Sequence, residues 1–162
     1  MQASKSYRTD NALWPWGLAL IRVVVGLAFF MHGYQKLFQQ GVDGVGGFFG
    51  SLGVPAPGFF ALVVSLLETF GGLALIVGLL TRVVGVLLAV DMLVALLLVH
   101  RPNGFFVGDG GIELVLVLGA AALALALTGP GPLSLDHPLG IERRFAGHDR
   151  DHDRPGLTGS RG

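Results

Sequence analysis

Four long apolar segments constrain this chain more than any other feature of its sequence. Residues 13–38, 59–80, 82–100 and 111–128 consist mainly of aliphatic and aromatic side chains, and the last three segments carry a single acidic residue apiece. A helix needs about 20 residues to cross the hydrocarbon core of a bilayer, with roughly 17–25 tolerated. A helix of a soluble protein would instead keep one polar face. The sequence therefore predicts an all-α fold, an integral membrane bundle of four transmembrane helices.

Charged residues are concentrated at the two ends of the chain. The sequence has 162 residues, of which 52% are hydrophobic, and only ten of its 22 formal charges lie between residues 11 and 140. The net charge is zero, so no basic surface for nucleic acid is expected. Because the chain contains no cysteine, disulfides, thiolate catalysis, iron–sulfur clusters and zinc–thiolate sites are excluded for this chain alone. We expect a lipid bilayer as the main partner and no metal site.

The distribution of Lys and Arg predicts the orientation in the membrane, because short cytoplasmic loops carry an excess of basic residues. The two ends of the chain and the turn at Arg82 hold most of these residues, whereas Lys36 and Arg101 lie on the opposite side. We therefore expect both termini in the cytoplasm. The predicted domains are a cytoplasmic segment at 1–12, the membrane domain at 13–128 and a cytoplasmic tail at 129–162 that is disordered after about residue 145.

The connection between the first two apolar segments has an unusual composition. Residues 39–58 are rich in glycine, yet they include Phe48, Phe49 and Leu52. A plain linker would not need these apolar side chains, so the composition favours a short amphipathic or re-entrant segment at the membrane interface. The alternative is an irregular loop whose phenylalanines touch lipid headgroups.

Glycines inside the apolar segments indicate close helix packing. Lipid provides no hydrophobic force that brings helices together, so small residues that let two backbones approach are favoured at the contacts. The glycines expected in this role are Gly26, Gly33, Gly71, Gly72 and Gly78.

Two ionisable residues lie deep inside the apolar segments. A charged side chain at the centre of a membrane helix costs about 2.5–3.5 kcal/mol on insertion scales, so it requires a partner, a cavity or a function. Counting residues at 1.5 Å of rise each places Arg22 and Asp91 at a similar height above the cytoplasmic surface. The sequence therefore predicts a structural ion pair between them.

The opposite end of the predicted bundle contains a denser group of polar residues, to which all four helices contribute. Polar groups that converge where an apolar bundle meets water are typical of a ligand site. Snorkelling or capping of helix ends is the structural alternative. The residues of this predicted outer site are His32, Lys36, Glu68, His100, Asn103 and Glu113.

Four stretches of this chain resemble the DoxX family of small bacterial membrane proteins. They read MHGYQKLF at 31–38, LLETFGGLALIVGLLTR at 66–82, LLLVHRPNGFF at 96–106 and GPGPLSLD at 129–136. The resemblance implies a four-helix, multi-pass protein of the bacterial inner membrane. It also implies a link to membrane redox systems, either a quinone-linked oxidoreductase or an oxidative-stress or thiol-detoxification complex.

These observations together favour a subunit or partner of such a redox system, with quinone as the expected ligand and no covalently attached cofactor. His32 or His100 would hydrogen-bond a quinone oxygen, Glu68 would transfer protons, and Lys36 would stabilise a reduced anion. A non-catalytic scaffold that recruits soluble redox enzymes is the alternative. A small-molecule transporter and a haem protein with two axial histidines are less favoured. Whether the protein is itself an enzyme, and whether it forms a homo-oligomer, stay open.

Overall fold

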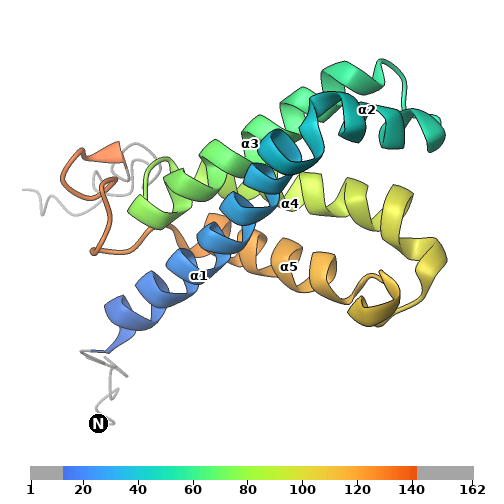
Figure 1. Cartoon of the computed structure of the whole chain (residues 1–162). Helices are drawn as coiled ribbons and strands as arrows, with labels where there is room; N and C mark the ends of the chain where they lie inside the picture. Colours follow the sequence, from blue (N-terminus) through green and yellow to red (C-terminus); the bar gives the residue numbers. More distant parts are fainter. Residues whose placement is uncertain (1–12, 142–162) are drawn as a thin grey trace, which may run out of the picture.

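The computed structural model of this protein describes residues 13–141, and the regular elements in that range are all helical (Figure 1). The all-α prediction is therefore confirmed for this part of the chain. The expectations for residues 1–12 and for the tail beyond residue 145 concern residues outside it. The five α-helices are α1 (Trp14–Tyr34), α2 (Gly41–Ser51), α3 (Pro57–Val77), α4 (Thr81–Ala95) and α5 (Glu113–Thr128).

Short helical segments of other types extend two of these helices. A π-helix, η1 (Gln35–Gln40), follows α1 without a break, and a second one, η2 (Leu96–His100), follows α4. Two 3₁₀ turns, η3 (Arg101–Asn103) and η4 (Val107–Asp109), lie in the connection to α5. Isolated π turns inside α-helices are rare and often occur at functional sites.

Three helical stretches are long and apolar enough to cross a membrane. They span Trp14–Ser51, Pro57–Val77 and Thr81–Asn103, whereas α5 is apolar but only 16 residues long. Large hydrophobic side chains are exposed on all of these helices. A surface of this kind is stable only against lipid or another protein, so the chain is a membrane protein in contact with the bilayer.

The helices are arranged as two closely packed pairs. α1 makes its main contact with α3, and α4 makes its main contact with α5. The second pair, α4 and α5, is drawn in yellow-green to orange in Figure 1 and lies beside the first pair. The two pairs meet mainly where α4 contacts α3. The interior between the pairs is filled by side chains from several helices, including Phe29, Leu75, Leu88 and Leu125.

Local sequence signals explain several helix boundaries. Proline suits the first turn of a helix, where its missing N–H is not needed, and Pro15 and Pro57 occupy such positions in α1 and α3. Gly78 ends α3 with a φ of 73°, a left-handed conformation that glycine adopts without steric cost.

Glycine allows α1 and α3 to pack backbone against backbone. A Cβ atom at Gly72 would lie 2.5 Å from the backbone nitrogen of Phe30 and 2.6 Å from the carbonyl oxygen of Gly26. A Cβ at Gly33 would overlap the backbone of Thr69. Gly71 faces α4 instead, where its added Cβ would lie 3.3 Å from Val84.

The α4–α5 pair contains a glycine contact of the same kind that the sequence interpretation missed. A Cβ at Gly85 would lie 2.7 Å from the carbonyl oxygen of Ala122. Both helix pairs therefore depend on a position where no side chain is tolerated.

Arg22 is buried, with 3% of its surface exposed, and its partners differ from the prediction. Its guanidinium donates hydrogen bonds to the carbonyl oxygens of Pro130 and Leu133. Its charge interacts with the carboxylate of Asp136. No ion pair links Arg22 to Asp91, so the predicted Arg22–Asp91 pair is wrong. The physical reason is that the chain after α5 folds back and brings two carbonyl acceptors to the terminal nitrogens of the guanidinium.

Asp136 connects this returning segment to the start of α4. Its carboxylate accepts hydrogen bonds from the backbone N–H groups of Leu80, at 2.7 Å, and Thr81, at 3.0 Å. These are amide groups that a helix start leaves without an intrahelical partner. Leu80 has a φ of 50°, which is costly for a non-glycine residue, and the carboxylate stabilises this turn. The first part of the expected tail is therefore an integral part of the fold.

We predict that Asp136→Ala destabilises the protein by about 1–3 kcal/mol, because it removes the cap of α4 and leaves two amide groups without a partner. The measurement is the thermal unfolding midpoint of the purified protein in detergent. Asp109→Ala, a change at an exposed acidic residue, is the control and should leave the midpoint unchanged. An Asp136→Ala midpoint equal to that of the control would contradict this role.

We also predict that Gly72→Ala destabilises the protein by about 1–3 kcal/mol, since the added methyl group meets rigid backbone atoms rather than a flexible side chain. Gly17→Ala is the matched control, because a Cβ at Gly17 has nothing within 4 Å. Alanine favours helices over glycine by up to about 1 kcal/mol, so the control should be neutral or stabilising. Equal effects of the two changes would show that the α1–α3 contact is not limiting.

Candidate functional site

A cavity of about 910 Å³ lies between the helices, at the end away from Trp14. Its walls come from the last part of α1, the first part of α3, the last part of α4 and the first part of α5. Both π-helical segments contribute to it, η1 through Gln35, Lys36 and Gln40 and η2 through Leu98, Val99 and His100. The local change of helix type thus occurs where the cavity forms.

Most of the cavity wall is apolar and partly aromatic. Phe29 lies at its inner end, fully buried in the core, and Phe60, Met92 and Leu118 come from three other helices. A wall of this kind suits an apolar ligand, with the few polar groups determining its orientation.

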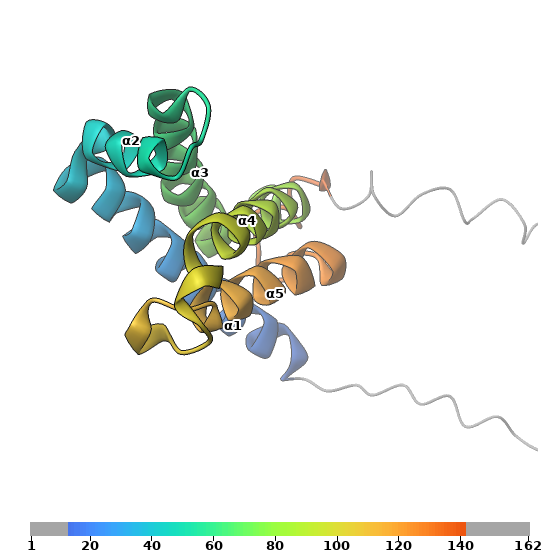
Figure 2. The same ribbon diagram turned by 90° about the vertical axis from the view of Figure 1, so that its right-hand side faces the viewer.

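Helix α2 covers one side of the cavity. At Gly41 the backbone has a φ of 73°, and the chain turns there so that α2 points away from the axis of α1 (Figure 2). α2 then packs against α3, and Phe48 and Phe49 line the cavity. Of residues 39–58, expected to form a short amphipathic or re-entrant segment, Gly41–Ser51 form helix α2, and its two phenylalanines line the cavity.

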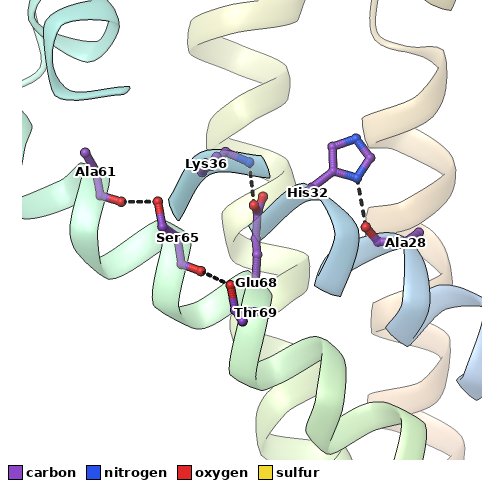
Figure 3. Close-up of polar contacts among 7 residues, drawn as sticks. All are labelled: Ala28, His32, Lys36, Ala61, Ser65, Glu68 and Thr69. Carbon is purple, nitrogen blue, oxygen red and sulfur yellow. Dashed lines mark hydrogen bonds and ion pairs between the residues drawn. The ribbon is translucent and has the colours of Figure 1, made fainter. Parts of the chain in front are cut away.

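Lys36 and Glu68 form an ion pair inside this cavity (Figure 3). The Glu68 side chain is 3% exposed and that of Lys36 is 21% exposed. The neighbouring hydroxyl groups do not solvate the carboxylate, because Ser65 donates to the carbonyl oxygen of Ala61 and Thr69 to that of Ser65. The ammonium group of Lys36 is therefore the main compensation for the buried charge of Glu68.

Asp91 belongs to the same polar group. It lines the cavity from α4 and lies within electrostatic and hydrogen-bonding reach of Glu68, with Lys36 also acting on its charge. Its Oδ2 atom is buried and has no hydrogen-bond partner within the described chain. The sequence interpretation assigned Asp91 to Arg22 and so missed it as a residue of this site.

The two predicted histidines also line the cavity, and each is oriented by a backbone carbonyl. The Nδ1 atom of His32 lies 2.8 Å from the carbonyl oxygen of Ala28 (Figure 3). The Nδ1 atom of His100 lies 2.7 Å from the carbonyl oxygen of Gly110. In both rings the other nitrogen, Nε2, has no hydrogen bond to the described residues.

The remaining two predicted site residues do not line the cavity. Asn103 is exposed and donates long hydrogen bonds, of 3.4 and 3.3 Å, to the carbonyl oxygens of Val99 and Gly110. Glu113 accepts a hydrogen bond of 3.0 Å from the backbone nitrogen of Val107. Both residues stabilise the connection between α4 and α5. The structure thus brings together His32, Lys36, Glu68 and His100, adds Asp91, and leaves Asn103 and Glu113 outside.

We predict that Lys36→Met destabilises the protein by about 3–5 kcal/mol, because it leaves the buried carboxylate of Glu68 without its counter-charge. The double change Lys36→Met and Glu68→Met should recover most of this loss, since the buried carboxylate of Glu68 is then removed together with its counter-charge. Thermal unfolding in detergent measures both effects, and Arg101→Met, at an exposed position, is the control. A double variant as unstable as Lys36→Met would argue against the ion pair.

Comparison with known proteins gives a consistent family assignment. The DoxX family model matches residues 17–101. The chain is 40% identical over 120 residues to a Bacillus subtilis protein named putative oxidoreductase CatD, covering 74% of this chain and 84% of that relative. It is also 35% identical over 144 residues to the uncharacterized membrane protein Rv3486 of Mycobacterium tuberculosis, covering 82% and 86%.

A third relative, an uncharacterized protein of Haemophilus influenzae, is 33% identical over 126 residues, which cover 76% of this chain and 90% of that protein. No solved structure matches the chain.

Proposed function

This chain belongs to the DoxX family, and from that premise and its cavity we propose that it is a redox-associated membrane protein that binds a quinone or a similar lipid-soluble ring compound. The observation that carries the proposal is the apolar cavity of about 910 Å³ with an ion pair buried inside it. Small-molecule sites usually have volumes of about 300–1,000 Å³, apolar walls and a small number of polar groups.

The chemistry of a quinone fits this arrangement. Its ring is planar and apolar and suits the phenylalanine side chains that line the cavity, whereas its oxygen atoms need polar partners at the edge. Reduction of a quinone consumes protons, and carboxyl and imidazole groups are the side chains that exchange them near neutral pH. In this proposal Glu68 and Asp91 handle protons, and His32 and His100 bind the ligand oxygens.

The proposal includes a location and an orientation. α5 would be a fourth span, since its 16 residues extend about 24 Å, which is most of the thickness of the hydrocarbon core. With both termini in the bacterial cytoplasm, the cavity lies at the outer end of an inner-membrane bundle. The name of the Bacillus subtilis relative, putative oxidoreductase, supports a soluble or membrane-bound redox enzyme as the partner.

We predict that the purified protein in lipid nanodiscs binds a short-chain benzoquinone and that Val64→Trp abolishes the binding. Val64 lines the cavity, so the larger side chain fills the space that the ring would occupy. Val63→Trp is the matched control, because Val63 is 40% exposed on the outside of the same helix. The measurement is the dissociation constant of the quinone, determined by calorimetry for the unchanged protein and for each of the two variants.

The proposal predicts the same affinity for Val63→Trp as for the unchanged protein. A protein that binds neither the quinone nor its reduced form would contradict it, and so would full binding by a correctly folded Val64→Trp variant.

A further inference from the structure

Building on the proposed function, we infer that the cavity selects the reduced, hydroxyl-bearing form of its ring ligand, a quinol, with Asp91 as a residue that determines this specificity. The inference follows from an inventory of hydrogen-bonding groups. A quinone offers only acceptor oxygens, whereas a quinol offers two hydroxyl donors. Apart from the remaining N–H groups of Lys36 and the amides of two glutamines, the polar groups that the protein leaves available in the cavity are acceptors.

Each of the two histidines in the cavity has one ring nitrogen bonded to a backbone carbonyl group. A carbonyl oxygen can only accept a hydrogen bond, so the ring nitrogen that faces it must carry the proton. This applies to Nδ1 of His32, bonded to Ala28, and to Nδ1 of His100, bonded to Gly110. In a neutral imidazole the other nitrogen is then an acceptor. Both histidines therefore present an acceptor Nε2 atom for a ligand.

The charged residues of the cavity include more hydrogen-bond acceptors than counter-charges. The cavity contains two carboxyl groups, Glu68 and Asp91, but only one ammonium group, that of Lys36. Lys36 donates one hydrogen bond to Glu68, which compensates its positive charge, and its two other N–H groups are the donors that remain in the cavity. The Oδ2 atom of Asp91 remains a buried acceptor without a partner. A buried acceptor of this kind is costly until a donor reaches it, and a ligand hydroxyl is such a donor.

The same inventory disfavours an anionic ligand. A small anion would meet a group with more carboxyl than ammonium functions in an apolar cavity, and like charges at short range are strongly unfavourable there. Gln35 and Gln40 also line the cavity, but an amide both donates and accepts and so does not distinguish between the two forms. The role of Lys36 is thus to neutralise Glu68 rather than to bind a reduced anion.

The test compares three ligands on the full-length protein in nanodiscs at about pH 8 without oxygen. They are a short-chain benzoquinol, its dimethyl ether, in which both donors are blocked, and the corresponding quinone. We expect the quinol to bind about tenfold more tightly than either other ligand, as one added hydrogen bond predicts. Thiosulfate is the anionic probe and should not displace the quinol.

Two variants of Asp91 assign the selectivity to this residue. Asp91→Leu should reduce quinol affinity to that of the dimethyl ether, and Asp91→Asn, which keeps one acceptor oxygen, should give an intermediate value. Asp43→Leu, at an exposed acid of α2, is the matched control and should retain the preference. A ¹⁵N spectrum of the histidines should show protonated Nδ1 atoms and an Nε2 signal that moves when quinol is added.

The inference is overturned if the quinone binds as tightly as the quinol, or if correctly folded Asp91→Leu and Asp91→Asn both keep the full preference. Thiosulfate that displaces the quinol would overturn it as well. Binding of both forms with equal affinity would leave the proposed function standing. Failure of both forms to bind would instead contradict the proposed function itself.

Discussion

Polar groups within the membrane part of this protein need partners from the protein or from a ligand, because lipid offers none. The structure meets this requirement at two separate places. At one end, the guanidinium of Arg22 is bonded to the carbonyl groups of the segment after α5. At the other end, Lys36 is bonded to Glu68. The packing of the helices around these two places determines the shape of the molecule.

Close backbone contact and the cavity are related features of this packing. Gly72 brings α3 against α1 along their middle, so the two helices have little freedom to separate there. Beyond this contact α1 changes to a π-helix, and the chain turns at Gly41 into α2. A tight contact in the middle and a change of direction beyond it leave space for the cavity at this end. The same sequence of features, a glycine contact followed by a π-helix, occurs in α4, through Gly85 and η2.

The sequence was sufficient to predict the helical class and the DoxX family, because long apolar segments and the ordered motifs are local signals. It was not sufficient to assign partners to buried charges. Residue counting gives the height of Arg22 and Asp91 in the membrane but not the direction in which each side chain points. The predicted pair between them failed for a second reason: residues 129–136 have no apolar periodicity that would reveal their return to the helix ends.

The composition of the outer polar group was predictable only in part for a related reason. His32, Lys36, Glu68 and His100 line the cavity, whereas Asn103 and Glu113 hold the α4–α5 connection. All six residues lie near the same end of their helices, and sequence position alone cannot distinguish a side chain that faces a cavity from one that caps a turn. The glycine spacing could have revealed Gly85, since it interrupts an apolar helix in the same way as Gly26 does.

The polar contacts around Arg22 differ from the polar group in the cavity, and this difference supports a ligand only in the cavity. Near Arg22, both terminal guanidinium nitrogens are bonded to carbonyl groups, and both oxygens of Asp136 are bonded to amide groups. These contacts are made within the chain and serve to hold helix ends together. In the cavity, by contrast, one carboxylate oxygen of Asp91 is unpartnered and two histidines keep a ring nitrogen available. Two buried atoms near Arg22, its own Nε and the Oγ1 of Thr81, also have no partner among the described residues, but neither residue lines the cavity. The open acceptors of Asp91 and the histidines do line it, and a hydroxyl-bearing ligand is the partner that would complete them.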